Sequence, residues 1–297
     1  MTKKLNNQHD FLQKRRDLEQ DYWNRVDTLD PISSISAIDI TTIDRCNRSC
    51  VFCPRHDQSV YPNRNVKMTA ENAKIIGERL SDIGYKGTIH ISGFGENLLN
   101  KEVVDIIREI KSRNPDAFID CNTNGDPLSL KLMNRLIDAG LDCLNINLYD
   151  GEYQVEEFEE MLESVSNEFY TYRMHYDSDH GIIFNNRSGL VQWIDIQDNT
   201  VDKVKGSKCY MPFYKMMIDW SGDVLFCSND WGREHIVGNV YEQSIRDVWM
   251  SDKMKDIRIR LSEGDRDFSP CNGCNVKGTM VGENSFNILM QHYEKGL

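Results

Sequence analysis

The sequence has no long hydrophobic run and fewer basic than acidic residues. No apolar stretch approaches the roughly 20 residues that a membrane-spanning helix needs, and there is no secretory signal. We therefore expect a soluble, cytoplasmic protein without a membrane partner. The 35 Lys and Arg against 47 Asp and Glu give a formal net charge of −12. Phosphate-binding surfaces are basic, so this charge argues against nucleic acid as the main partner and would tolerate a cationic substrate.

The nine cysteines do not indicate a disulfide framework, because their number is odd and no secretory signal is present. Three of them form the run Cys46-x3-Cys50-x2-Cys53, directly after a strand-like stretch at 37–42. Three thiolates this close can hold one metal cluster, and they are one short of the four that a [4Fe–4S] cubane usually takes from protein. One iron is then open to another ligand. Structural zinc is the alternative, although it prefers four ligands in two C-x2-C knuckles.

This run resembles the signature of the radical S-adenosylmethionine (SAM) enzymes, including the aromatic Phe52 before the third cysteine. The resemblance implies that the open iron chelates the amino and carboxylate groups of SAM. An electron from a flavodoxin- or ferredoxin-type donor then splits SAM into methionine and a 5′-deoxyadenosyl radical. In such enzymes the cofactor carries the chemistry, and the protein positions it.

Strand and helix patterns alternate along most of the 297-residue chain. After a helix at 8–27, strands are predicted at 37–42, 88–92, 117–122, 142–148, 168–175 and 181–185, with helices at 69–83, 101–112, 129–139 and 155–164. Such repeats predict an α/β fold with a parallel sheet. The family resemblance implies a partial (β/α)6 TIM-type barrel over 37–205. A helical extension would precede it at 1–36, and a small cluster-binding domain would follow at 206–297.

The second strand ends in Gly93-Phe94-Gly95-Glu96. Glycines let the backbone approach a ligand, and a glutamate can accept hydrogen bonds from an ammonium group. The segment resembles the glycine-rich motif that holds the SAM amino group, with Phe94 and Asn97 as departures. An ordinary turn is the alternative.

The third and fourth strands also end in polar residues. Asn122-Thr123-Asn124-Gly125 resembles the family's turn near the ribose and carboxylate of SAM, the alternative being a plain Asn-Gly turn. Asn147 lies on the fourth strand and shares a face with Asn145. The alternative is that these two asparagines form a buried pair whose hydrogen bonds are made within the protein. We expect cofactor contacts from Phe52, Gly93, Gly95, Glu96, Asn122, Thr123, Asn124 and Asn147.

Two residues are candidates for catalysis. Arg187 lies in an Asn-Arg-x-Gly segment like those of radical SAM proteins with a second cluster domain, and could clamp a carboxylate or hydroxyls. Cys121 could donate a hydrogen atom, as thiols do in radical SAM epimerases. A strand cysteine is more often a small buried hydrophobe, and this holds for Cys143 too. Further candidates for substrate contact are Arg55, Tyr149 and Asp150.

A second cysteine set comprises Cys209, Cys227, Cys271 and Cys274, with Cys227 after a predicted hairpin that turns at 221–222. Four thiolates can hold zinc or a fully ligated [4Fe–4S] cluster. The region resembles the SPASM/twitch extension of radical SAM enzymes. No cysteine follows Cys274, which suggests the shortened α+β twitch form with one auxiliary [4Fe–4S] cluster. The ligand layout resembles that of enzymes of the 2-deoxy-scyllo-inosamine dehydrogenase type.

The resemblance therefore implies a radical SAM oxidoreductase. The radical would abstract hydrogen from a small carbohydrate or aminocyclitol alcohol, and the auxiliary cluster would accept the second electron. The alternatives are a redox-neutral epimerase, a peptide maturase whose partner is a peptide, and a zinc-stabilised binding protein without enzymatic activity.

Overall fold

One sheet of eight strands organises the molecule, of which the computed structural model describes residues 8–175, 185–194 and 200–296. The strand order is β5-β4-β3-β2-β1-β6-β7-β8. Every neighbouring pair from β5 to β6 is parallel, which confirms the predicted α/β class. The parallel strands are β1 (Ala37–Ile40), β2 (Thr88–Ile91), β3 (Phe118–Thr123), β4 (Cys143–Leu148), β5 (Tyr170–Met174) and β6 (Lys215–Ile218).

The helices between these strands begin and end close to the predicted positions. They are α2 (Ala70–Asp82), α3 (Val103–Arg113), α4 (Leu130–Asp138) and α5 (Tyr153–Met161). Thr69 starts α2 with a capping box to Asn72, because its hydroxyl accepts from the backbone N–H that the first turn leaves unpaired. Gly77 allows α2 to approach α3, since a Cβ there would lie 2.9 Å from the carbonyl oxygen of Glu109.

The C-terminal region extends the same sheet. Strand β6 pairs with β1 in parallel, and β7 (Asp223–Leu225) and β8 (Ile236–Asn239) follow as antiparallel neighbours. The hairpin predicted to turn at 221–222 is thus present, and the regions expected to be separate domains share one sheet. The sixth barrel strand expected at 181–185 falls almost entirely on residues outside the described ranges. The architecture is that of a partial barrel with an antiparallel C-terminal region.

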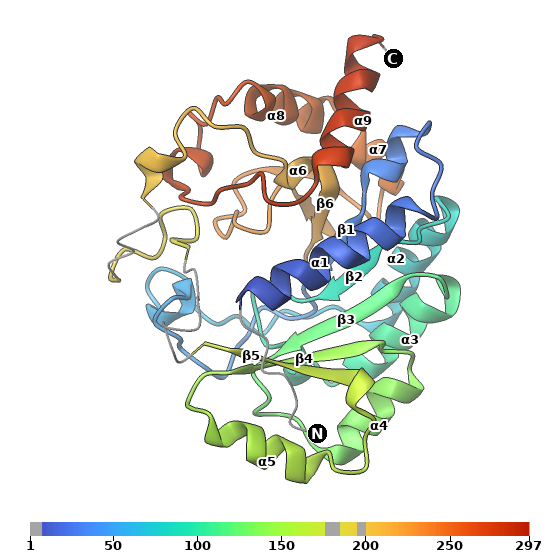
Figure 1. The fold of residues 1–297 in the computed structure, drawn as a ribbon, viewed down its shortest axis with the longest axis vertical. Coiled ribbons are helices and arrows are strands. Elements are labelled where there is room, and N and C mark those ends of the chain that lie inside the picture. The colour runs from blue at the N-terminus through green and yellow to red at the C-terminus, as the bar shows by residue number, and fades with distance from the viewer. Residues whose placement is uncertain (1–7, 176–184, 195–199, 297) are drawn as a thin grey trace.

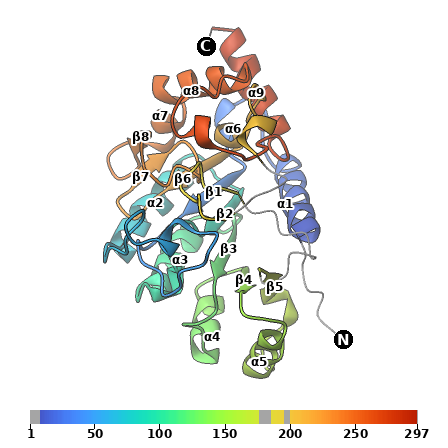
Figure 2. The ribbon, with the colours of Figure 1, turned by 90° about the vertical axis from the view of Figure 1, so that its left-hand side faces the viewer.

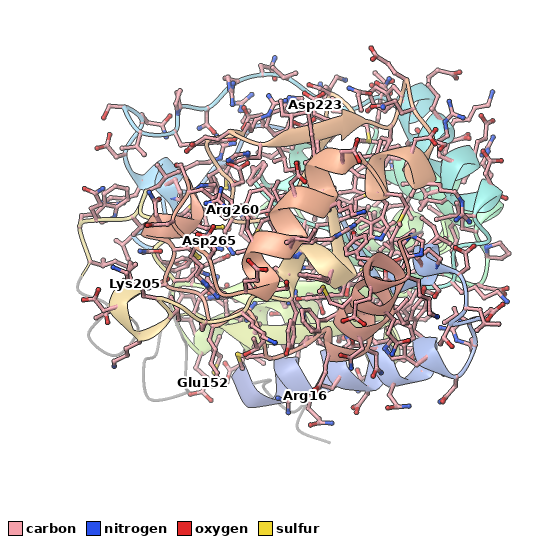
Figure 3. All side chains as sticks on the ribbon, turned by 90° about the horizontal axis from the view of Figure 1, so that it is seen from above. Arg16, Glu152, Lys205, Asp223, Arg260 and Asp265 are labelled. Atoms are coloured by element: carbon pink, nitrogen blue, oxygen red, sulfur yellow. The ribbon has the colours of Figure 1, made fainter. Side chains whose placement is uncertain are left out.

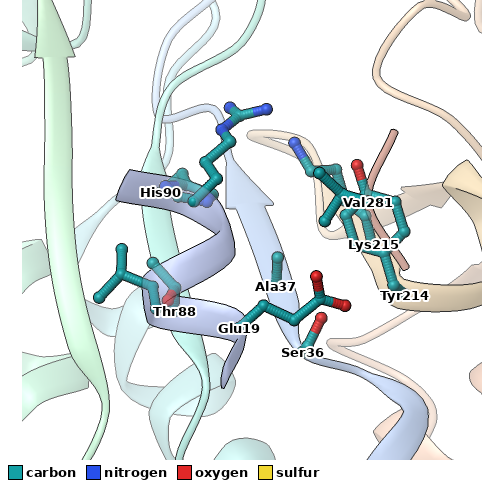
Figure 4. Close-up of a pocket in the computed structure, with 10 residues that line it drawn as sticks. Glu19, Ser36, Ala37, Thr88, His90, Tyr214, Lys215 and Val281 are labelled. Atoms are coloured by element: carbon teal, nitrogen blue, oxygen red, sulfur yellow. The ribbon is translucent and has the colours of Figure 1, made fainter. Parts of the chain in front are cut away.

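Helix α1 (Gln8–Trp23) lies across the beginnings of the strands (Figure 1). It ends four residues before the predicted limit, and Tyr22 fixes its last turn by donating to the carbonyl oxygen of Ser33 (2.7 Å). Between α1 and the starts of β1, β2 and β6 lies a cavity of about 20 Å³, which Glu19, His90 and Lys215 help to line (Figure 4). This volume suffices for about one water molecule. The helix therefore closes the amino-terminal side of the sheet.

The C-terminal helices gather at one end of the molecule, opposite α4 and α5 (Figure 2). They are α6 (Met211–Tyr214), α7 (Ile245–Trp249), α8 (Asp252–Ser262) and α9 (Glu283–Glu294). Trp249 is buried and donates to the hydroxyl of Ser34 (2.8 Å), which joins this end to the segment before β1. At the edge, Arg260 of α8 pairs with Asp265 (2.6 Å; Figure 3). Within the described ranges, no helix is both long and apolar enough to span a membrane.

Candidate active site and second cysteine site

A cavity of about 150 Å³ lies where the carboxyl ends of β1 to β4 meet. The carboxyl ends of parallel strands share one edge of a sheet, which brings their loops together there. The cavity is lined by all three cysteines of the first set and by every residue for which a cofactor contact was predicted, namely Phe52, Gly93, Gly95, Glu96, Asn122, Thr123, Asn124 and Asn147. Arg187 and Trp231 complete the wall from later parts of the chain.

Asn63 holds the first cysteine of the cluster loop in place. Its side-chain oxygen accepts from the backbone N–H of Cys46 (2.9 Å), and its amide nitrogen donates to the carbonyl oxygen of Cys46 (3.1 Å). Farther along, the N–H of Cys53 donates to the carbonyl oxygen of Cys50 (2.9 Å). The loop is thus shaped by hydrogen bonds that leave all three thiols free to bind iron.

Arg55 and Asp44 form a buried ion pair behind this loop. Arg55 also donates to the carbonyl oxygen of Phe94 (2.6 Å) and to the side chain of Asn63 (2.8 Å), while Arg64 donates to Asp44 (2.5 Å). Arg55 was predicted as a substrate contact, but protein acceptors engage all three of its nitrogens. The structure instead gives it the role of fastening the cluster loop to the loop after β2.

The three half-buried thiols keep their protons as long as no metal is bound. Burial, reinforced by the neighbouring Cys53 and Cys46, raises the pKa of Cys50 to about 12, and burial raises the pKa of the other two as well. Free thiols here are protonated at neutral pH, so iron must displace their protons when it binds. Asn124 adds a long amide contact to the sulfur of Cys46 (3.9 Å).

Glu96 joins the loop after β2 to the turn after β3. One of its oxygens accepts from the N–H of Leu98 (3.0 Å) and the hydroxyl of Thr123 (2.9 Å), and the other from the N–H of Asn124 (2.7 Å). Burial raises the pKa of Glu96 to about 7 against the effect of these three donors. A carboxylate has about four acceptor positions, so one remains for a ligand ammonium. Glu96 therefore has a structural role, and its contact with SAM stays a prediction.

Aromatic rings support the far wall of the cavity. Tyr149 stacks with Phe52 (5.9 Å between ring centroids) and with His175 (4.9 Å), and the guanidinium of Arg48 lies over its ring (5.3 Å). His175 contacts the side-chain oxygen of Asn147 (2.9 Å), whose amide nitrogen donates to the carbonyl oxygen of Thr123 (2.9 Å). The aromatic stack and these two hydrogen bonds fix the orientation of Asn147 at the cavity.

Arg187 reaches the cavity from a strained turn. Arg187 and Ser188 have φ angles of 48° and 57°, which residues other than glycine rarely adopt. Burial lowers the pKa of Arg187, and Cys53 and Tyr149 oppose that shift. Strain of this kind concentrates at functional sites, where surrounding contacts maintain it. The position fits the predicted role at the barrel mouth.

Cys121 does not line this cavity. It is fully buried in the hydrophobic core, with its sulfur 3.8 Å from the carbonyl oxygen of Asn122. Successive side chains of a strand point to opposite faces, so Asn122 faces the cavity and Cys121 packs behind it. The prediction of a catalytic thiol at Cys121 is therefore not supported, whereas the core alternative agrees with this position.

The second cysteine set also surrounds one space. Cys209, Cys227, Cys271 and Cys274 line a cavity of about 20 Å³. Backbone N–H groups point at two of the sulfurs, from Asn229 to Cys227 and from Val276 to Cys274 (both 3.4 Å). Such donors are typical around iron–sulfur thiolates. Among the described residues, no three His, Cys, Asp or Glu side chains are placed to hold a single metal ion.

The segment 185–190 connects the two cysteine sites. Asn186 donates from its side chain to the carbonyl oxygen of Gly273 (2.7 Å), inside the Cys271–Cys274 knuckle. A Cβ on Gly273 would lie 2.9 Å from the carbonyl oxygen of Ser188, so only glycine allows this approach. Arg187, between these residues in sequence, faces the first cavity. One short segment thus contacts both sites.

Two features of the site did not emerge from the sequence. Arg48, inside the cysteine run, forms bidentate pairs with Asp126 and Asp150 at 2.6–2.9 Å, and so ties the cluster loop to the loops after β3 and β4. Asp150, predicted as a substrate contact, is engaged by this pair. Trp231 enters the cavity four residues after Cys227. For Arg48, the sequence offered one signal, its position within the cysteine run. For Trp231, no sequence pattern indicated a place at the cavity.

Comparisons with known proteins agree with this geometry. The radical SAM superfamily model matches residues 40–169, and the SPASM model, described as an iron–sulfur cluster-binding domain, matches 209–275. The S-adenosyl-L-methionine-dependent 2-deoxy-scyllo-inosamine dehydrogenase of Niallia circulans is 28% identical over 86% of this chain and 98% of its own. A GTP 3′,8-cyclase of Lactiplantibacillus plantarum is 37% identical, but over only 41% of this chain and 35% of its own.

Solved structures show the same fold. BtrN in complex with AdoMet and 2-DOIA superposes with a TM-score of 0.71 and 26% identity, covering 84% of this chain and 96% of its own. Native anSMEcpe with bound AdoMet matches at 0.52 and 12% identity, over 87% of this chain and 96% of its own. The radical SAM match contains the first cysteine set, and the SPASM match contains the second. The chain is therefore an enzyme of the radical SAM superfamily with a C-terminal SPASM-type iron–sulfur cluster-binding region.

Proposed function

We propose that this enzyme oxidises one alcohol of a small carbohydrate or aminocyclitol to a ketone. The observation that carries the proposal is the four-thiol site joined to the first cavity by the segment 185–190. A dehydrogenation removes two electrons from the substrate. The hydrogen atom carries away the first electron, and a second cluster can accept the second electron. The 28%-identical relative of similar length is a dehydrogenase, which supports the same reaction class.

The residues of the first site have separate roles in this proposal. Cys46, Cys50 and Cys53 would hold a [4Fe–4S] cluster, and the loops at 93–96 and 122–124, which line the same cavity, would bind SAM. When bound, these groups would supply a 5′-deoxyadenosyl radical for hydrogen abstraction, and one auxiliary [4Fe–4S] cluster would supply an electron acceptor. Arg187 orients the alcohol, whose proton leaves to solvent or to a nearby base. Cys209, Cys227, Cys271 and Cys274 are the auxiliary ligands.

The test is anaerobic turnover of the reconstituted enzyme, with dithionite or reduced flavodoxin as electron donor. The substrates would be 2-deoxy-scyllo-inosamine, other aminocyclitols, inositols and simple sugars, each deuterated at the carbinol carbon. The proposal expects deuterium in 5′-deoxyadenosine and one ketone per SAM consumed. An inverted alcohol with no ketone would indicate an epimerase. SAM cleavage stimulated only by peptides would replace the proposal with peptide maturation.

A further inference from the structure

Two N–H donors at the first cavity lack a partner. The indole nitrogen of Trp231 and the Nε atom of Arg187 are both buried, and neither has a hydrogen-bond acceptor within the described part of the chain. Both residues line the cavity. A buried donor left unpaired destabilises the fold, and native proteins keep few of them. Both donors belong to residues that line one cavity, where a ligand can supply the missing acceptors.

Trp231 is held firmly enough to act as a fixed donor. Its side chain is 5% exposed and packs on Phe94 (4.8 Å between centroids) and Tyr61 (4.9 Å). Its backbone lies in a turn in which the N–H of Arg233 donates to the carbonyl oxygen of Asp230 (3.1 Å). Phe94, the departure from the paired glycines after β2, therefore provides the surface on which Trp231 rests. An indole N–H can donate but cannot accept.

The charges around the cavity favour neutral acceptor groups, such as hydroxyls, at these donors. Arg48 is paired with two aspartates and Arg55 with Asp44, so neither is available for an anion. Arg187 faces Cys53, which carries negative charge once it binds iron. A ring bearing several hydroxyls offers neutral oxygen acceptors in different directions, as two fixed donors require.

We propose that Trp231 and Arg187 each donate a hydrogen bond to an oxygen of the substrate, which makes the substrate a polyhydroxylated ring and Trp231 a specificity-determining residue. The inference rests on the proposed function, because it assigns the ligand of the same cavity. It adds a donor from the C-terminal region, only four residues after an auxiliary-site cysteine. The substrate would then be held from both the barrel and the C-terminal region.

The experiment is calorimetric titration of the anaerobic holoenzyme, with oxidised clusters, saturating SAM and no reductant, so that no turnover occurs. The probes are 2-deoxy-scyllo-inosamine and scyllo-inositol. Trp231→Phe keeps an aromatic ring against Phe94 and Tyr61 but removes the N–H. It should weaken polyol binding about tenfold, the effect of one buried hydrogen bond, without changing the Kd of SAM. Trp220→Phe, a buried tryptophan also against Phe94 but not lining the cavity, is the matched control.

Several results would overturn the inference. Wild-type protein that binds neither polyol would exclude the substrate class. Unchanged polyol affinity in Trp231→Phe would place the N–H against the ring of Tyr61, and weakened SAM binding alone would assign it to the cofactor. If Trp231→Phe does not fold, ultraviolet resonance Raman spectra of wild type can report whether an indole N–H gains a hydrogen bond on polyol addition. No spectral change would also overturn it.

Different results would contradict the proposed dehydrogenation and the proposed two-donor site. Enzyme that binds the polyols through Trp231 but forms no ketone after reduction contradicts the dehydrogenation and leaves the two-donor site intact. Ketone formation with the same KM in wild type and Trp231→Phe contradicts the two-donor site and leaves the dehydrogenation intact.

Discussion

Asn186 and Asn275 exchange two hydrogen bonds, each accepting through its side-chain oxygen from the other's backbone N–H (3.0 and 3.3 Å). Asn186 precedes Arg187 at the first cavity, and Asn275 follows the last auxiliary-site cysteine. The pair therefore sets the position of one site relative to the other.

Asn186→Asp tests this connection. The aspartate still accepts from Asn275, but it loses the donor to Gly273 and places a carboxylate oxygen against that carbonyl oxygen. We expect a loss of about 1–3 kcal/mol in the loop's anchoring. Polyol affinity should fall several-fold while iron content stays near that of wild type. Asn185→Asp is the control, because it keeps its acceptor for the N–H of Arg187 (3.0 Å). Equal effects of both variants would contradict the role of Asn186.

Iron stoichiometry tests the two cysteine sites. After anaerobic reconstitution we expect about eight irons per wild-type chain, as two cubanes contain, and about four in a Cys46/Cys50/Cys53→Ala triple variant. The triple variant should lose SAM cleavage. A Cys271/Cys274→Ala variant should also keep about four irons but retain the signal of a SAM-binding cluster. Wild type with four irons and bound zinc would leave the proposed oxidation without its electron acceptor.

Gly278→Ala tests the packing of the auxiliary site. A Cβ at this position would lie 2.1 Å from the sulfur of Cys209, closer than any contact allows. We expect the variant to lose the auxiliary cluster and keep the first one, which iron analysis and electron paramagnetic resonance of the reduced protein would separate. Gly232→Ala serves as control, since its Cβ would meet only the flexible side chain of Glu234 at 3.2 Å. Full iron content in Gly278→Ala would show that Cys209 is not a ligand in this position.

Thr123→Val tests the connection between the two SAM loops. The hydroxyl of Thr123 donates to Glu96 and accepts from the N–H of Gly125 (3.0 Å). Valine keeps the shape but leaves both partners unsatisfied, which costs about 1–3 kcal/mol. The Kd of SAM, measured calorimetrically on the oxidised holoenzyme, should rise roughly 5- to 150-fold by the same free energy. Thr123→Ser restores the hydroxyl and should restore most of the affinity; failure to do so would contradict positioning through Glu96.

Much of the fold followed from local patterns. The alternation of strands and helices, the cap at Thr69 and the hairpin at 221–222 are consequences of neighbouring residues, and the structure confirms them. The pairing of β6 with β1 could not be foreseen, because it joins strands about 180 residues apart in sequence. The common location of the polar residues at the strand ends was predictable, because the carboxyl ends of parallel strands meet at one edge of the sheet.

The sequence by itself determined the chemistry of the chain, because cysteine spacing decides which thiols can hold one cluster, and both cysteine sets line the cavities expected of them. Only the tertiary structure decided what the polar residues around them do. Glu96 and Arg55 are engaged by protein groups, Cys121 faces the core, and Trp231 reaches the cavity from the C-terminal region. Hydrogen-bond partners and burial depend on which distant segments meet in space, and no local pattern records that.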